Sequence, residues 1–420
     1  MNKHGIALAA DSAVTIGRGD EDAKIFPSAN KIFALSKYEP VAIMVYGNAE
    51  LLGRSWETIV KLYRRELSDK SFPTVHDYVL DFVRFVGGSE WLFPESSQAR
   101  YVRDYAGQVL RAIAAQVREE VKKHIDEQGT IDDEVVETIV TSEVGYWSAI
   151  WGDAAELPFV TAGHHQAVKD VYGDEIDDLI ASVFESVAMD TDTLEQVREL
   201  ALQLLTHVPA LDLPSVTGIV IAGFGTDDLC PMLEELRADG VAAGELLAWG
   251  GRRGEVNEDN NAYVSAFAQG EMVSRFMEGV DPAYQGTIED SVSKIMEGYT
   301  DALVKKLGRR PSKAVLGELA EARREMLEEF SARLEQHRQL SYVANVIDVV
   351  GVLPLEELAH MAESLVNLTS FKRRVSMETE SVGGPIDVAV ISRGDGFIWI
   401  RRKHYFEQSL NPHFLANYYK

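Results

Sequence analysis

The sequence is poor in cysteine, basic residues and long apolar runs. Cys230 is its single cysteine, so no disulfide can form within the chain, and this composition is typical of a reducing compartment. No apolar run approaches the roughly 20 residues needed to cross a bilayer. The first twenty residues include Asp11 and Asp20, which are unsuited to a signal peptide. We therefore expect a cytoplasmic protein with no membrane partner.

Basic residues are outnumbered, with 41 lysines and arginines against 67 aspartates and glutamates in 420 residues, for a formal net charge of −26. Nucleic-acid phosphates are bound by clustered lysine and arginine, so this excess of acid argues against a nucleic-acid partner. The simplest interpretation of the charge is that it keeps the protein dispersed in water. The hydrophobic content of 46% is typical of a globular protein with a core.

Patterns typical of metal or thiol chemistry are also missing. There is no Cys-x-x-Cys spacing, and the adjacent His164 and His165 would point in different directions on a regular element, with no carboxylate at ligand spacing. Cys230 and His207 lack the local signature of a thiol protease. We therefore expect no metal and no cofactor.

Short apolar runs typical of strands lie near both ends and in the middle of the chain, with helical patterns between them. The runs at 31–35 and 41–46 are separated by a polar segment containing proline, which predicts a hairpin. Pro354 favours the start of a helix over 355–373. A loop is expected over 250–261. The expected strands are 6–14, 31–35, 41–46, 216–223, 229–233, 245–249, 262–268, 386–392 and 397–401.

This order of strands, helices, strands, helices and strands predicts an α+β fold in which helices cover sheets. We expect a single enlarged domain over residues 1–420. The expected core segments are 1–72, 213–284 and 353–405, and the expected helical insertions are 73–212 and 285–352.

Four short motifs occur in a particular order along the chain. They are Ala9-Ala10-Asp11-Ser12, Asn30-Lys31-Ile32-Phe33, Val45-Tyr46-Gly47-Asn48-Ala49 and Gly383-Gly384-Pro385-Ile386-Asp387. In this order the chain resembles the proteasome β-subunit family of N-terminal-nucleophile (Ntn) hydrolases. The resemblance covers residues 1–66, 215–280 and 354–402. It implies an αββα four-layer sandwich, a peptide or protein substrate, and a homo-oligomer in the form of a ring or a dimer.

Enzymes of this family attack an amide bond with the side chain of their N-terminal residue, and the α-amine of that residue serves as the base. The resemblance implies a catalytic role for three residues here. Lys31 would keep a positive charge beside the nucleophile, Asp11 would hold Lys31, and the N–H of Gly47 would stabilise the oxyanion. The implied activity is proteasome-like, threonine-type hydrolysis of peptide or amide bonds.

The chain departs from the family pattern at its start. The family's aspartate lies further from the nucleophile than Asp11 lies from Met1, so the nucleophile would precede Met1. Three interpretations stay open: a nucleophile encoded upstream, a non-catalytic structural or assembly subunit, and a different chemistry on the same fold. The segment 377–382 also differs, because it does not clearly supply the aspartate and serine that the family has before the Gly-Gly turn.

Each candidate residue also has a purely structural interpretation. Asp11 could end a strand as a turn residue, and Lys31 could be a solvated lysine at a sheet edge. Gly47 could simply break the chain between a strand and a helix, and Gly383-Gly384 is typical of an ordinary turn.

Overall fold

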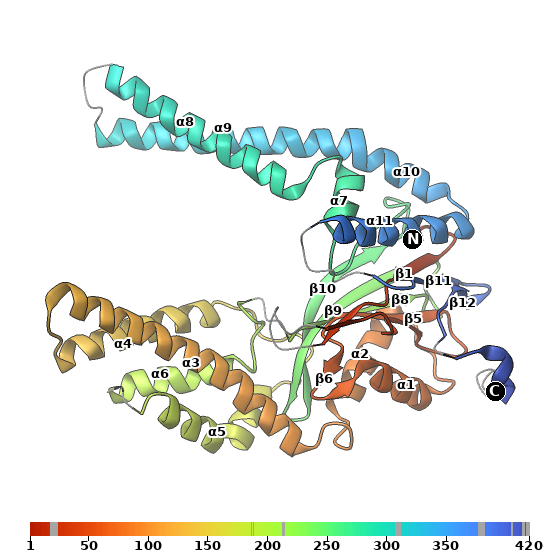
Figure 1. Cartoon of the computed structure of the whole chain (residues 1–420), viewed down its shortest axis with the longest axis horizontal. Coiled ribbons are helices and arrows are strands. Elements are labelled where there is room, and N and C mark those ends of the chain that lie inside the picture. The colour runs from red at the N-terminus through yellow and green to blue at the C-terminus, as the bar shows by residue number, and fades with distance from the viewer. Residues whose placement is uncertain are drawn as a thin grey trace. The chain divides into compact units, whose positions relative to one another are not determined.

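The computed structural model describes residues 1–16, 24–185, 187, 189–211, 215–306, 312–376, 383–404, 406–413 and 416. The chain divides into two compact units. We call Lys31–Gly254 the central unit, and Met1–Asn30 together with Glu255–Lys420 the terminal unit. Both units combine helices with strands, as Figure 1 shows, so the predicted α+β class is confirmed.

The central unit is built on a five-stranded sheet with the order β10-β9-β8-β5-β4. The pairs β4–β5, β5–β8 and β8–β9 are antiparallel. The predicted hairpin is therefore confirmed, because β4 and β5 are its two strands. The strands are β4 (Ile32–Ala34), β5 (Val41–Gly47), β8 (Thr217–Gly223), β9 (Met232–Ala242) and β10 (Glu245–Glu255).

Two helices, α1 (Trp56–Leu67) and α2 (Val75–Gly87), pack on one face of this sheet. Alternate side chains of β5 point to that face and enter a common core with both helices. Each helix starts at a side-chain cap. Ser55 accepts a hydrogen bond from Thr58 N at α1, and Thr74 forms a reciprocal capping box with Asp77 at α2. A short ribbon of β6 (Glu50–Leu51) and β7 (Arg54–Ser55) precedes α1.

Four further helices of the central unit form a second apolar core, which also takes in Ala242 and Leu247 from the ends of β9 and β10. They lie within the segment 73–212, for which helices were predicted. The four are α3 (Glu95–Gln128), α4 (Asp133–Gly152), α5 (His164–Val183) and α6 (Thr191–Gln203).

The terminal unit contains a three-stranded antiparallel sheet with the order β1-β11-β12. Helix α11 (Leu355–Val375) packs against this sheet, and Ala359 of the helix joins Val388 and Val390 of β11 in a buried cluster. The strands are β1 (Ile6–Ala10), β11 (Asp387–Ser392) and β12 (Gly396–Arg401), and a ribbon of β2 (Val14–Ile16) and β3 (Lys24–Phe26) follows β1.

The remaining helices of the terminal unit lie between 271 and 352, so they begin before the helical insertion predicted over 285–352. Ser312 caps the start of α9 by accepting a hydrogen bond from Val315 N. The helices are α7 (Glu271–Glu278), α8 (Pro282–Lys306), α9 (Lys313–Arg338), a π-helical turn (Gln339–Val343) and α10 (Ala344–Val352); a short 3-10 turn, Gln408–Leu410, lies near the C-terminus.

Four local predictions were wrong. The strand predicted over 6–14 ends at Ala10, because the Asp11 carboxylate turns the chain by accepting from the N–H groups of Ala13 and Gly383. No strand forms over 262–268: Ala262 makes only an isolated bridge to Asn2, and Ala268 has a left-handed backbone with φ +69° that ends any extended run. The predicted loop over 250–261 begins as strand, because β10 continues to Glu255. The predicted strand over 229–233 starts only at Met232, because Gly225–Asp228 forms a turn held by the Asp228 carboxylate.

Candidate functional site

The β4–β5 hairpin brings Lys31 and Gly47 to the same end of the five-stranded sheet. Lys31 directly precedes β4, and its carbonyl accepts a hydrogen bond of 2.8 Å from Val45 N on β5. The N–H groups of alternate residues on a strand point to the same side. The N–H of Gly47 therefore points, like that of Val45, toward the β4 side of the sheet. Two of the three predicted site residues thus lie together.

Gly47 has a backbone that only glycine adopts readily. Its φ is +79°, and a Cβ atom added there would lie 2.6 Å from the carbonyl oxygen of Val216. The following residue, Asn48, donates its N–H to that same carbonyl at 3.3 Å. The structural interpretation of Gly47 as the end of a strand is confirmed, and it is compatible with a role for the Gly47 N–H.

A buried pair of side chains fixes the turn that contains Gly47. Trp56 Nε1 donates to Thr217 Oγ1 at 2.9 Å, and Thr217 Oγ1 donates to the carbonyl of Asn48 at 2.9 Å. Trp56 and Thr217 are almost completely buried. Sequence analysis missed Thr217, because nothing in a strand sequence marks which hydroxyl will meet a tryptophan from a helix.

Asp11 directly follows β1 and belongs to the terminal unit. Its Oδ2 accepts hydrogen bonds of 3.0 Å from the backbone N–H groups of Ala13 and Gly383. Ser12 is buried, and its hydroxyl donates to the carbonyl of Pro385. These contacts tie the end of β1 to the Gly383-Gly384 turn, as expected for a turn-forming aspartate. The action of Asp11 on Lys31 stays a prediction, and the segment 377–382 lies outside the described residues.

A polar row crosses the central sheet one residue before Gly47. Tyr46 of β5 lies over Gly218 of β8, where an added Cβ would collide with the tyrosine ring, and its hydroxyl donates to Glu235 of β9. Arg252 of β10 donates to the other carboxylate oxygen of Glu235 through its backbone N at 2.8 Å and its Nε at 3.0 Å. Gly251 has no Cβ atom, and the side chain of Glu235 occupies the space that a Cβ would need. Sequence analysis missed this cluster.

The ionisation of the cluster follows from these contacts. Burial by itself would raise the pKa of Glu235, but the hydrogen bonds from Tyr46 and Arg252, with the charge of Arg252, outweigh burial and hold the pKa below its usual value. Burial, helped by the hydrogen bond to Glu235 and its charge, raises the pKa of Tyr46 to about 12. The cluster therefore consists of a carboxylate, a neutral phenol and a guanidinium at neutral pH.

The lowered pKa of Glu235 predicts a loss of stability in acid. A carboxyl group whose folded-state pKa is depressed stabilises the fold above its unfolded-state pKa, near 4.5, and loses this contribution as the pH falls further. We expect Glu235→Gln to lower the free energy of unfolding by about 1–3 kcal/mol at neutral pH, and by less below pH 4.5. Urea unfolding at both pH values measures this difference. Glu66→Gln, at an exposed position of α1, is the control; a constant difference for Glu235→Gln across pH would contradict the prediction.

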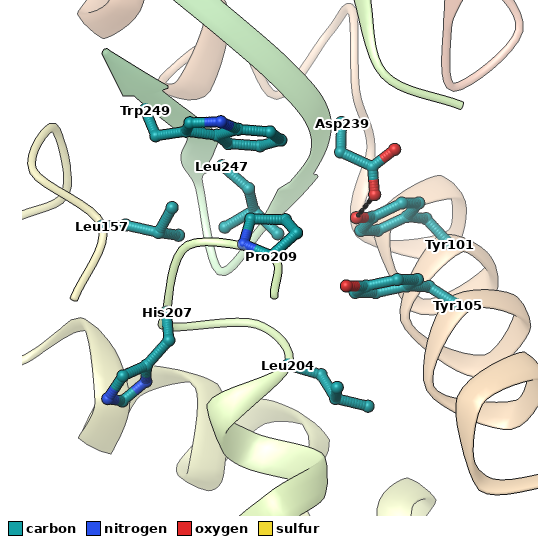
Figure 2. Close-up of a pocket in the computed structure, with 9 residues that line it drawn as sticks. All are labelled: Tyr101, Tyr105, Leu157, Leu204, His207, Pro209, Asp239, Leu247 and Trp249. Carbon is teal, nitrogen blue, oxygen red and sulfur yellow. Dashed lines mark hydrogen bonds between the residues drawn. The ribbon is translucent and has the colours of Figure 1, made fainter. Parts of the chain in front are cut away.

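A small cavity in the central unit contains two unpaired polar atoms (Figure 2). Tyr101 donates to Asp239 Oδ2 at 2.6 Å, whereas Asp239 Oδ1 and the hydroxyl of Tyr105 have no hydrogen bond of normal geometry within the described part of the chain. Burial raises the pKa of Asp239, an effect that hydrogen bonding to Ser215 and Tyr101 partly offsets. The lining residues are Tyr101, Tyr105, Leu157, Leu204, His207, Pro209, Asp239, Leu247 and Trp249.

This cavity suits a water molecule better than a substrate. Its interior has room for about one water. A water there can accept from the Tyr105 hydroxyl and donate to Asp239 Oδ1, which would satisfy both unpaired atoms. The cavity is therefore interpreted as a structural feature of the second core.

The adjacent histidines His164 and His165 make separate contacts. His164 Nε2 lies 3.2 Å from the carbonyl of Leu205, whereas His165 Nε2 lies 3.2 Å from a carboxylate oxygen of Glu199, so the two rings have different partners. Within the described ranges, no three His, Cys, Asp or Glu side chains are grouped as metal ligands. No helix in those ranges is long and apolar enough to span a bilayer.

Comparison of the chain with protein-family models, with curated proteins and with solved structures gave no match. Its function therefore has to be inferred from the residues themselves. The end of the β4–β5 hairpin is the strongest candidate site, because Lys31 and the end of β5 at Gly47 lie at the same end of the sheet.

Proposed function

We propose that this protein is an amide-bond hydrolase of the proteasome-like Ntn class, acting on a peptide or protein substrate. The observation that carries the proposal is the backbone hydrogen bond from Val45 N to the carbonyl of Lys31, two residues before β5 ends at Gly47. This bond brings the backbone of a lysine and a strand end with an N–H donor to the same end of one hairpin. A cation and an N–H donor are the two groups needed to lower the pKa of a nucleophile and to stabilise an oxyanion.

The chemistry has two halves. The hydroxyl or thiol of the nucleophile attacks the substrate carbonyl, and an amine accepts its proton. The oxyanion formed on the carbonyl oxygen accepts a hydrogen bond from Gly47 N–H, and the positive charge of Lys31 stabilises the developing negative charge. Collapse of the intermediate breaks the C–N bond, and the leaving amine takes the proton. Water then hydrolyses the acyl–enzyme by the same route, which returns the free nucleophile and releases the acid.

The nucleophile of this mechanism is the side chain of an N-terminal threonine, serine or cysteine. Its own α-amine would be the proton acceptor. In this arrangement Asp11 would orient Lys31, while its hydrogen bonds to Ala13 and Gly383 hold the end of β1 in place.

The αββα sandwich is part of the proposal. Such a sandwich needs two sheets, each covered by helices on its outer face. The five-stranded sheet has α1 and α2 on one face, and the three-stranded sheet has α11 against it. Each unit thus has a sheet with helices packed against it, and this supports the sandwich part of the proposal.

The test is to express the chain with its in-frame upstream residues and to treat it with an electrophile that reacts with an N-terminal nucleophile. We expect the new first residue to be labelled, and Lys31→Ala to slow labelling and peptide hydrolysis by about 10²-fold or more, because the positive charge is lost. Lys61→Ala is the matched control, since Lys61 is an exposed lysine of α1 paired with Glu57. Absence of labelling, or equal rates in the two variants, would refute the hydrolase.

A second candidate function is that of a structural or assembly subunit without chemistry. It is favoured by the pair α8 and α9, whose described side chains include none that is buried. This candidate predicts that Lys31→Ala leaves assembly unchanged and that no nucleophile reacts in the extended chain. The labelling experiment therefore separates the two functions.

A further inference from the structure

Helices α8 and α9 of the terminal unit form a long antiparallel pair without a core of their own. They contain 25 and 26 residues, a length of about 38 Å each. Figure 1 shows them lying alongside each other. None of their described side chains is buried. Two helices alone bury too little apolar surface to be stable by packing, so such a pair normally packs against further helices.

The two helices meet partly through charged groups. Arg323 of α9 lies 3.4 Å from Glu297 of α8, and Arg338 at the other end of α9 lies 3.2 Å from Glu278 of α7. These ion pairs are partly exposed, and exposed pairs contribute little stability. The stability of the hairpin therefore needs a further contribution.

Apolar side chains instead project into solvent from the halves of α8 and α9 that lie nearest to their connection. Ile295 and Tyr299 of α8 are 69% and 65% exposed, and Met326 of α9 is 59% exposed. On each helix the exposed apolar residues are spaced by four or seven, which places them on one face. We call these residues the apolar stripe; it consists of Ile295, Tyr299, Leu303, Val315, Leu319 and Met326.

The stripe belongs to a wider concentration of exposed apolar residues. Residues 271–375 are a quarter of the chain, yet they hold more than half of the large apolar side chains that are exposed in the described ranges. Monomeric proteins rarely keep such apolar surface in water, and a concentration of it marks an interaction site.

The charge of the hairpin indicates which partner covers it. Residues 282–338 contain ten acidic and ten basic side chains, so this segment is neutral, whereas the whole chain has a net charge of −26. All of the excess acid therefore lies outside the hairpin. The rest of the chain has the whole net charge of −26, which on average opposes contact between two copies there, whereas the hairpin is a surface on which they can meet without net repulsion. A partner recognised by its charge would instead bind the acidic remainder.

We propose that the α8–α9 hairpin is a self-association surface, on which a second copy of this chain packs its own apolar stripe. Two hairpins meeting in this way form a four-helix bundle with two-fold symmetry, in which each stripe covers the other. The acidic and basic residues along α9 are interspersed, so opposite charges can face each other across a two-fold axis. The interaction does not depend on Lys31 or on any catalytic group.

The test is the oligomeric state of the full chain by sedimentation equilibrium. We expect the wild type to be a dimer or a larger assembly at about 10 µM. The double variant Ile295→Glu with Leu319→Glu introduces charges on both helices of the stripe and should weaken association by about 100-fold. Val171→Glu is the matched control, because Val171 is an exposed apolar residue of a helix in the central unit. It should associate like the wild type.

Circular dichroism checks that the double variant keeps the helix content of the wild type. If the double variant loses helix, the milder variant Tyr299→Ser replaces it. A wild type that stays monomeric at this concentration would overturn the proposal. Association that survives the stripe variants, or that Val171→Glu weakens equally, would also overturn it. An assembly that forms only when a different protein is added would show that the stripe serves another partner, which overturns the assignment to a second copy.

Discussion

Replacing Trp56 with alanine is expected to lower the free energy of unfolding of the central unit by about 3–5 kcal/mol. Trp56 is among the largest fully buried side chains and packs in the core between α1 and the five-stranded sheet. Its removal leaves a cavity that a rigid sheet and two capped helices cannot close. It also removes the hydrogen bond from Nε1 to Thr217 Oγ1 at 2.9 Å, so the turn after Gly47 loses its support.

Urea unfolding followed by circular dichroism measures this loss. Trp56→Phe keeps most of the bulk and removes only the indole N–H, so we expect a smaller loss of about 1–3 kcal/mol. Trp91→Ala is the control at a side chain that is 62% exposed, and its effect should stay within about 0.5 kcal/mol. Equal effects of Trp56→Ala and Trp91→Ala would show that the core does not depend on Trp56.

Replacing Asn2 with alanine is expected to lower the free energy of unfolding of the terminal unit by about 2–4 kcal/mol. Asn2 is completely buried, and its Nδ2 donates to the carbonyls of Val350 at 2.7 Å and Leu353 at 2.9 Å. Its Oδ1 accepts from His4 N at 2.9 Å. Alanine would leave these backbone groups without partners in a site closed to water, which costs more than the hydrogen bonds contribute.

Thermal or urea unfolding of the variant measures the effect. The matched control is Asn260→Ala, because Asn260 Nδ2 also donates to a backbone carbonyl, that of Glu255 at 2.8 Å, but at an exposed position where water can replace the amide. The control should change stability by less than about 1 kcal/mol. If both substitutions lower the free energy of unfolding equally, burial does not explain the strength of the Asn2 contacts.

Local sequence signals predicted several elements well. The two short apolar runs separated by a polar, proline-containing segment predicted β4 and β5, because such runs are typical of buried strands. The proline at 354 likewise predicted the start of α11. Such signals work because they depend on a residue and its near neighbours in the chain.

Structural features that depend on residues far away in the chain were not predicted. The apolar run at 262–268 looks like a strand, but a strand also needs a neighbouring strand that continues beside it. This run instead meets the first two residues of the chain, through an isolated bridge between Ala262 and Asn2 and a hydrogen bond from Tyr263 N to the carbonyl of Met1 at 2.9 Å. The segment at 250–255 looks like a loop because of its glycines, yet Gly251 is there to make room for Glu235. In both cases the deciding partner lies elsewhere in the chain.

The candidate site likewise has one part that local sequence predicted and another part that only the tertiary structure shows. The sequence by itself predicted the hairpin, and a hairpin brings its two ends, near Lys31 and Gly47, together whatever surrounds it. Only the tertiary structure decided that Thr217 and Trp56 hold the Gly47 turn, and that Tyr46, Glu235 and Arg252 form one cluster. Those contacts join four strands and a helix that are far apart in the chain, and sheet order, which no local pattern encodes, determines which of them meet.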